Sequence, residues 1–282
     1  MIIFKGNDKF AYRDPACYYH NGVYYLFFTY SEKDSGYMYM RVGMSTSTDL
    51  KTWSEIRVLT KKELTLNFCS PGNVIEYNGE FILCVTSYPM PYTFDEWWCG
   101  DETARVFIMR TKDFETFSEP EVISAKGDIP IEKLGRMIDP YIIKKDEEFY
   151  LFFKQDGVSF SKSKDLKNWE YVSRADCGEN VCVIEREDGY FLLNSPDTGI
   201  SFKKSKDLVV WEDAGYTALN QENWDWAERR LSAGFAMEAP EGFPYKYILF
   251  FHGSRNVYPE THGNSTLAAA FTDDFETFYY DI

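Results

Sequence analysis

Ser47-Thr48-Asp49-Leu50-Lys51-Thr52-Trp53 is the first of five copies of one sequence motif, which we call the repeated phrase. The other four copies have the same Ser/Thr-x-Asp-Leu/Phe-x-x-Trp/Phe pattern and span residues 111–117, 163–169, 205–211 and 272–278. In such a phrase the aspartate accepts backbone N–H groups of a tight turn, and the apolar residues hold the flanking strands to a core. The five aspartates stand on average about 56 residues apart, a spacing typical of four-stranded propeller blades.

A second pattern opens each repeat and predicts a β-hairpin. Turn residues such as Asn21-Gly22, Asn78-Gly79 and Asp188-Gly189 separate short runs rich in Tyr, Phe, Val and Ile. The fifth copy is stretched before its second strand at 247–251. Five hairpins and five capped turns predict an all-β, five-bladed β-propeller of four-stranded antiparallel sheets. We expect one domain over 1–282, with blades at about 10–60, 66–122, 135–173, 176–215 and 228–282; a β-sandwich explains the double repeat poorly.

Composition limits the partners and the compartment. The net charge of −15 argues against nucleic acid and anionic membranes as partners, whereas a neutral sugar is indifferent to it. The N-terminus lacks the pattern of a secretory signal, and no apolar run is long enough to span a bilayer. Six cysteines without a CxxC pair indicate a reducing compartment. We expect a cytoplasmic protein, or a secreted or periplasmic one if a signal peptide has been removed; the oligomeric state is not predicted.

Superposing the hairpins brings three carboxylates into one register. Eleven positions before the aromatic residue that opens each second strand lie Asp14 (before Tyr25), Asp139 (before Tyr150) and Glu179 (before Tyr190), with Ser70 before Phe81. One aspartate in such a place is explained by an ordinary loop cap. Three on a closed ring would meet at one end of the channel, where their repulsion is unfavourable unless a site uses it. The register therefore predicts a functional site there.

The residues around these acids resemble the acidic signatures of glycoside hydrolase family 43 and, more loosely, of family 32. They are Tyr12-Arg13-Asp14-Pro15, Arg136-Met137-Ile138-Asp139-Pro140 and Cys177-Gly178-Glu179. The resemblance implies a five-bladed propeller glycosidase with Asp14 as general base, Asp139 as the residue that tunes pKa and orients the site, and Glu179 as general acid. It also implies inverting hydrolysis. The chain departs from the family pattern at Asn180-Val181, at Cys69-Ser70-Pro71 and in lacking the Asn-Asp-Pro-Asn-Gly of family 32.

Elementary chemistry agrees with these roles. Glycoside cleavage needs a protonated carboxyl at the leaving oxygen and an ionised one facing the anomeric carbon. A third negative charge near the acid would raise the pKa of the acid and keep it protonated near neutrality.

Further side chains are expected on the same face as substrate-binding candidates: Trp97, Trp98, Arg136, Trp224, Arg230 and His252. Packing of a long loop explains each tryptophan equally well. Many family members support a channel calcium with a histidine on the first strand of the last blade, but this chain has Arg230-Leu231-Ser232-Ala233-Gly234 there. We therefore expect no required cofactor and assign no metal ligands, while a channel calcium stays open.

Three functional interpretations stay open. The first is a hydrolase of short arabinose-, xylose- or galactose-containing oligosaccharides, with a role in polysaccharide degradation. The second is a related fructosidase or glycoside phosphorylase; a phosphorylase needs a basic pocket beside the acids, for which Arg136 and Arg230 are the candidates. The third is a non-catalytic propeller that binds carbohydrate or protein, which is favoured if Glu179 points away from the channel.

Overall fold

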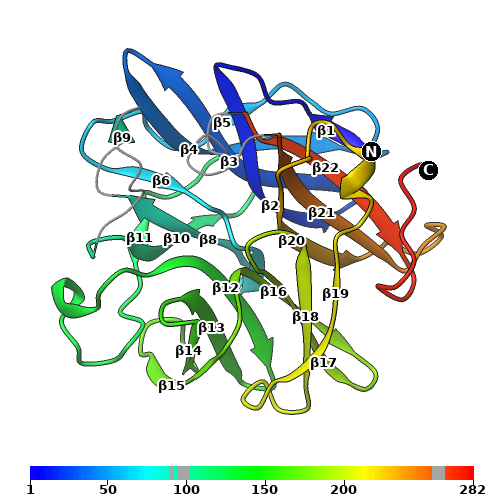
Figure 1. Cartoon of the computed structure of the whole chain (residues 1–282). Coiled ribbons are helices and arrows are strands. Elements are labelled where there is room, and N and C mark those ends of the chain that lie inside the picture. The colour runs from blue at the N-terminus through cyan, green and yellow to red at the C-terminus, as the bar shows by residue number, and fades with distance from the viewer. Residues whose placement is uncertain (89–91, 94–101, 256–263) are drawn as a thin grey trace.

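The computed structural model describes residues 1–88, 92–93, 102–255 and 264–282. Their strands form five antiparallel sheets arranged around a common axis, which confirms the predicted five-bladed β-propeller (Figure 1). The only helical turns in these ranges are two short 3-10 turns, η1 (Ile131–Lys133) and η2 (Gln221–Asn223). Accordingly, the described chain has no helix with the length and apolar character to cross a bilayer.

The first two blades each carry an extra strand. The first blade runs outward in the order β2 (Phe10–His20), β3 (Val23–Asp34), β4 (Tyr37–Ser47), β5 (Arg57–Val58), and β9 (Tyr92–Thr93) also pairs with β4. In the second blade the inner strand is broken in two, so that both β6 (Asn67–Cys69) and β7 (Val74–Tyr77) pair with β8 (Glu80–Tyr88), followed by β10 (Arg105–Thr111) and β11 (Glu121–Val122).

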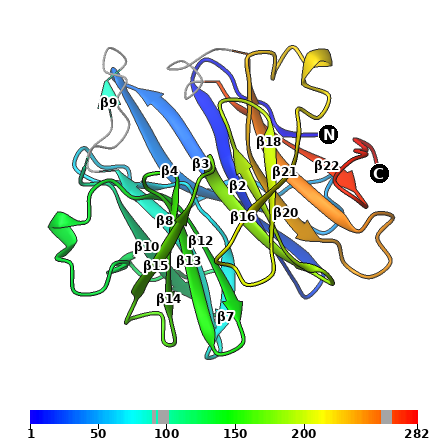
Figure 2. The ribbon, with the colours of Figure 1, turned by 60° about the horizontal axis from the view of Figure 1, so that its bottom comes forward.

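The next two blades are regular four-stranded meanders. The third contains β12 (Ile138–Lys145), β13 (Glu148–Lys154), β14 (Val158–Ser163) and β15 (Glu170–Ala175). The fourth contains β16 (Glu179–Arg186), β17 (Gly189–Ser195), β18 (Ile200–Ser205) and β19 (Glu212–Thr217). Figures 1 and 2 both show the innermost strands β2, β12, β16 and β20 gathered near the middle.

The fifth blade closes the ring with both ends of the chain. Its strands are β20 (Arg230–Glu238), β21 (Tyr247–Ser254), β22 (Thr266–Thr272) and, on the outside, β1 (Ile2–Phe4). The carbonyl of Met1 accepts the N–H of Ala269 at 2.8 Å. Pairing of the first strand with the last covers the outer edge of β22 and holds the N-terminus in the sheet.

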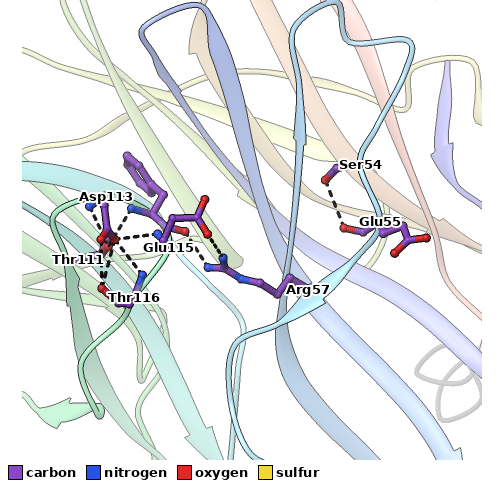
Figure 3. A network of polar contacts seen from close by, with 8 residues as sticks. Ser54, Glu55, Arg57, Thr111, Asp113, Glu115 and Thr116 are labelled. Atoms are coloured by element: carbon purple, nitrogen blue, oxygen red, sulfur yellow. Dashed lines mark hydrogen bonds and ion pairs between the residues drawn. The ribbon is translucent and has the colours of Figure 1, made fainter.

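The capped turns work as the repeated phrase predicts. In the second blade Oδ1 of Asp113 accepts the N–H groups of Glu115 and Thr116 at 2.8 and 2.9 Å, and these bonds lower the pKa of the aspartate (Figure 3). Arg57 reaches over from the first blade to Glu115 and to the carbonyl of Phe114. The phrase therefore shapes one blade and also links it to the blade before it.

The apolar residue that follows each aspartate packs into the core despite a left-handed backbone. The φ angles of Leu50, Phe114, Leu166, Leu208 and Phe275 all lie between 58 and 69°. This conformation is unfavourable for such side chains, and the buried aromatic and aliphatic contacts between the blades offset it.

Candidate active site

Each inner strand begins with the same irregularity, and these five irregularities surround the axis. In β2, β12, β16 and β20 the register shifts by an inserted residue, and in the second blade the gap between β6 and β7 takes its place. The inserted residue has a positive φ in all five blades. We call these the ring positions: Asp14 (48°), Ser70 (43°), Asp139 (52°), Asn180 (52°) and Ala233 (56°). Together with the residues after them they line a narrow axial cavity of about 20 Å³.

The expected register is wrong by one residue in the fourth blade. Tyr190 pairs with Ser205 of its capped turn, as Tyr24 pairs with Ser47, so Tyr190 is equivalent to Tyr24 and not to Tyr25. The reason is that Gly189 already belongs to the second strand, whereas Gly22 belongs to the turn. The ring position of this blade is therefore Asn180, and Glu179 stands one residue earlier, where the first blade has Arg13.

A hydrogen bond between neighbouring blades supports four of the ring positions. The acceptor lies on the second strand of the preceding blade, and we call it the junction residue. Thr29 Oγ1 accepts the N–H of Ser70 at 2.8 Å, and Thr86 Oγ1 accepts that of Asp139 at 2.9 Å. The remaining two bonds follow the same rule: Ser195 Oγ accepts from Ala233 at 2.7 Å, and His252 Nδ1 accepts from Asp14 at 3.2 Å.

The fifth junction, between blades three and four, departs from this rule. Its junction residue is Lys154, which pairs with Ile138 just as Thr29 pairs with Arg13. A protonated amine has three donors and no acceptor, so Lys154 cannot receive the N–H of Asn180.

Asp14 is a buried carboxylate with two hydroxyl donors. Thr29 donates to Oδ2 of Asp14 at 2.8 Å, and Ser70 approaches the same oxygen at 3.4 Å. The same Thr29 hydroxyl accepts from Ser70, so one side chain supports two ring positions. Asp14 is 8 % exposed and is thus held rigidly while still reachable from the cavity that it lines.

His252 is neutral and holds the backbone of Asp14. Its Nδ1 lies 3.8 Å from Oδ1 of Asp14, which would be an ion pair if the ring were protonated. Burial lowers the pKa of His252 well below its usual value, and the charges of Arg13 and Arg230 lower it further. Because Nδ1 accepts the N–H of Asp14, the neutral ring carries its proton on Nε2.

Asp139 is the carboxyl that its neighbours perturb most clearly. Burial raises the pKa of Asp139 above its usual range, and the negative charges of Glu179 and Asp14 raise it further, against the opposing effects of Arg136 and Arg13. Both other acids therefore act on Asp139 electrostatically. The three carboxylates identified in the sequence lie in one electrostatic neighbourhood, although they do not share one register.

Glu179 faces a second cavity next to the axial one. Its Oε1 accepts a charged hydrogen bond from Arg230 at 2.9 Å. The side chain is about one-third exposed and does not line the axial cavity; it lines an adjoining cavity of about 450 Å³. Just before it, Gly178 packs so closely that a Cβ would lie 1.9 Å from the carbonyl oxygen of Ser195.

A comparison with protein families identifies this propeller. The model of the "Glycosyl hydrolases family 32 N-terminal domain" matches residues 12–201, which include Asp14, Asp139 and Glu179. The chain belongs to this glycosyl hydrolase family. The resemblance to the propeller glycosidases of families 32 and 43 is thereby confirmed, and the enzyme class that the family supports is a glycosidase.

Solved structures place this family 32-type domain among several propeller glycosidases. An exo-1,5-α-L-arabinanase from a bovine ruminal metagenomic library is 17% identical over 99% of this chain and 100% of its own, with a TM-score of 0.67. An exo-β-1,3-galactanase from Clostridium thermocellum is 17% identical over 98% of this chain and 64% of its own (TM-score 0.68). The catalytic domain of a family 62 α-L-arabinofuranosidase from Coprinopsis cinerea is 14% identical over 95% and 93% (TM-score 0.69). At these identities the likeness shows the fold; a search of curated proteins finds no significant match.

The other predicted binding residues of this glycosyl hydrolase differ in their surroundings. Trp97 and Trp98 lie outside the described residues. Trp224 stacks on Trp226 at 5.0 Å between ring centroids and on Phe251 at 5.7 Å, so these tryptophans pack their loop onto the fifth blade. A role in sugar binding for either of them stays a prediction.

The predicted basic residues lie near the acids. Arg136 and Arg230 are close enough for their charges to act on Asp139 and His252 respectively. His252, proposed as a substrate ligand, is 1 % exposed and instead supports Asp14. For the calcium of related propellers, the described residues offer no group of three or more His, Cys, Asp or Glu side chains.

Sequence reasoning missed four of the five junction residues and the charge of Arg13 near Asp139. The fifth junction residue, His252, was expected on this face, but as a substrate ligand. Thr29, Thr86 and Ser195 attract no attention as single hydroxyl residues, because their role depends on the neighbouring blade. An alignment of the ends of the five second strands would have found Lys154, since it places one lysine among two threonines, a serine and a histidine.

Proposed function

We propose that this glycosidase cleaves short arabinose-, xylose- or galactose-containing oligosaccharides with inversion at the anomeric carbon. Asp14 acts as general base on the attacking water, Glu179 donates the proton to the leaving oxygen, and Asp139 orients the site. The observation that carries the proposal is the raised pKa of Asp139, which the charges of both Glu179 and Asp14 contribute to. Two further acids close to Asp139 supply the pair of carboxyl groups that acid–base cleavage of a glycoside needs.

The surroundings of each acid suit its proposed role. Thr29 and Ser70 donate to Asp14 and hold its carboxylate in place at the cavity that it lines. Arg230 holds the carboxylate of Glu179 at the border of the two cavities, where a leaving oxygen could meet it.

The test compares Asp14→Ala, Asp139→Ala and Glu179→Ala with wild type on aryl arabinosides, xylosides and galactosides. We expect all three variants to lose about 10²–10⁴-fold in kcat/KM, the range for positioned acid–base groups. Glu179→Ala should lose less on an aryl glycoside whose leaving group needs no protonation. Proton NMR of the first product formed distinguishes inversion from retention.

A second candidate function is carbohydrate binding without cleavage. It is favoured by one observation: Glu179 pairs with Arg230 and does not line the axial cavity. If none of the aryl glycosides is cleaved while wild type and all three variants bind sugar equally well, the binding function replaces the hydrolase.

A further inference from the structure

The cavity beside Glu179 is rich in cations within a strongly acidic protein. Three basic side chains line it, Lys154, Arg229 and Arg230, against the two carboxylates Glu179 and Asp197. The chain as a whole carries a net charge of −15. Because acidic residues outnumber basic ones in the whole chain, a cavity with more basic than acidic side chains is unexpected from the composition.

Lys154 occupies the junction position although it cannot accept the hydrogen bond that the other four junction residues accept. The other four junctions have an acceptor for the next blade, and a lysine cannot replace it. The side chain of Lys154, a residue of intermediate exposure, makes no hydrogen bond or ion pair with another described residue. A residue that breaks a local rule without a compensating internal contact is typical of a functional site.

Arg230 and Arg229 bring further donors to the same cavity. The Nε of Arg230 is buried and has no partner among the described residues, while its Nη2 donates to Oε1 of Glu179. A buried donor without a partner is unfavourable, and a bound acceptor relieves it. Arg229 is largely exposed, and its nearest carboxylate, Glu228, lies 3.6 Å away on the adjacent residue.

We propose that Lys154, Arg229 and Arg230 bind the carboxylate or phosphate group of an anionic sugar on the leaving-group side of the cleaved bond. The inference rests on the proposed function, in which Glu179 is the general acid. Asp14 and Asp139 line the axial cavity, and the cations lie around Glu179 in the adjoining one. Because the acid stands at the leaving oxygen, what lies beyond it is the leaving group.

The same placement argues against a phosphate nucleophile. A nucleophilic phosphate would have to approach the anomeric carbon from the side of the base, Asp14. Lys154, Arg229 and Arg230 line the cavity of the acid instead, whereas the charges of Arg13 and Arg136 act on Asp139. An anion bound to these cavity-lining cations would compete with Glu179 for the donors of Arg230. The Glu179 oxygen released in this way could then approach the leaving oxygen.

The test is equilibrium binding of glucuronic acid, glucose 6-phosphate and neutral glucose, measured by calorimetry on the full chain. Wild type should bind at least one anionic sugar about tenfold or more tightly than glucose, since a charged hydrogen bond is stronger than a neutral one. The anion that binds more tightly tells carboxylate from phosphate. Added salt should weaken that binding, because the groups are partly exposed.

Lys154→Thr is the decisive variant, because a threonine restores the acceptor found at other junctions and should leave the fold intact. It should weaken binding of the anionic sugar about tenfold and leave glucose unchanged. Lys164→Thr is the matched control, since it removes the same charge from an exposed place in the same blade. Equal affinities for anionic and neutral sugars, no binding of either anion at high millimolar concentration, or equal losses in both variants would overturn the inference.

These results are separate from those that test the hydrolase. Cleavage of neutral aryl glycosides without selective binding of anions removes this inference and leaves the proposed function. Selective binding that depends on Lys154, in a protein that cleaves no glycoside, keeps the anion site and removes the hydrolase.

Discussion

Four of the five blade junctions have a hydrogen-bond acceptor at the junction residue, whereas the fifth has a lysine there. At four of them a hydroxyl or a neutral imidazole accepts the N–H of the next ring position. At the junction between blades three and four the equivalent residue is Lys154, and the strand that follows begins with Glu179. The regular bond is what a propeller needs in order to hold its inner strands, so the irregular junction indicates where the chain serves another purpose.

The comparison also separates the two kinds of acid. Asp14 and Asp139 occupy regular ring positions and are both buried. Asp14 accepts a hydrogen bond from Thr29, and Asp139 is surrounded by charged side chains that act on its pKa. Glu179 precedes its ring position and lies in the open, cation-lined cavity. Rigid burial suits a base and an orienting group, while partial exposure suits an acid that must reach a leaving group.

Moving the carboxylate at the irregular junction should have the largest effect. The double variant Glu179→Asn/Asn180→Glu keeps composition and charge but transfers the acid to the ring position. We expect kcat/KM on aryl glycosides with poor leaving groups to fall about 10²–10⁴-fold, as for loss of a general acid. Asn180→Ala is the control and should keep far more activity; a double variant as active as wild type would refute the placement of the acid.

Breaking a regular junction should destabilise the fold. His252→Phe leaves the N–H of Asp14 without an acceptor, which we expect to lower the free energy of unfolding by about 1–3 kcal/mol. His252→Asn, whose Oδ1 can take the place of Nδ1, should retain much of that stability. Urea unfolding of both variants measures the difference, and equal losses would mean that the imidazole acts through its volume alone.

Asp139→Asn should change the pH dependence of stability. The pKa of Asp139 is above its unfolded value of 3.8, so above about pH 4 the folded protein keeps a proton that the unfolded chain releases. Wild type therefore loses stability as the pH rises towards the folded pKa, and asparagine does not. The variant should gain roughly 2–4 °C in Tm at pH 8 and no advantage at pH 4.

Asp49→Asn is the control of opposite sign. Backbone N–H groups lower the pKa of Asp49, so its contribution is present above pH 4 and is lost as the pH falls through the folded pKa. Its asparagine variant should be less stable than wild type near neutrality. A constant difference at all pH values for either variant contradicts the titration argument.

Repairing the irregular junction should give the smallest change. Lys154→Thr can accept the N–H of Asn180, and one such bond contributes about 1 kcal/mol. We expect Tm to rise by roughly 2–4 °C, whereas Lys164→Thr should not change it. No rise would show that the junction is already satisfied in another way.

The architecture was predictable because its signals are local. The capped turns and hairpins depend on residues within a few positions of one another, such as Asp113 with Glu115 and Thr116, and those contacts form as expected. The closing strand β1 was not predictable in this way, because it belongs to no copy of the repeat and pairs with residues at the other end of the chain. The register of the fourth blade failed because Gly189 lies in a strand, although it resembles a turn glycine in sequence.

The sequence by itself determined five repeats, their strands and turns, and the three acids Asp14, Asp139 and Glu179 at the starts of inner strands. Only the tertiary structure decided which of them lie at ring positions, that His252 supports Asp14, and that Lys154 faces Glu179 together with Arg230. The physical reason is the range of the interactions. Turns and hairpins are stabilised within one blade, whereas the environment of each acid is built by two blades whose residues stand far apart along the chain.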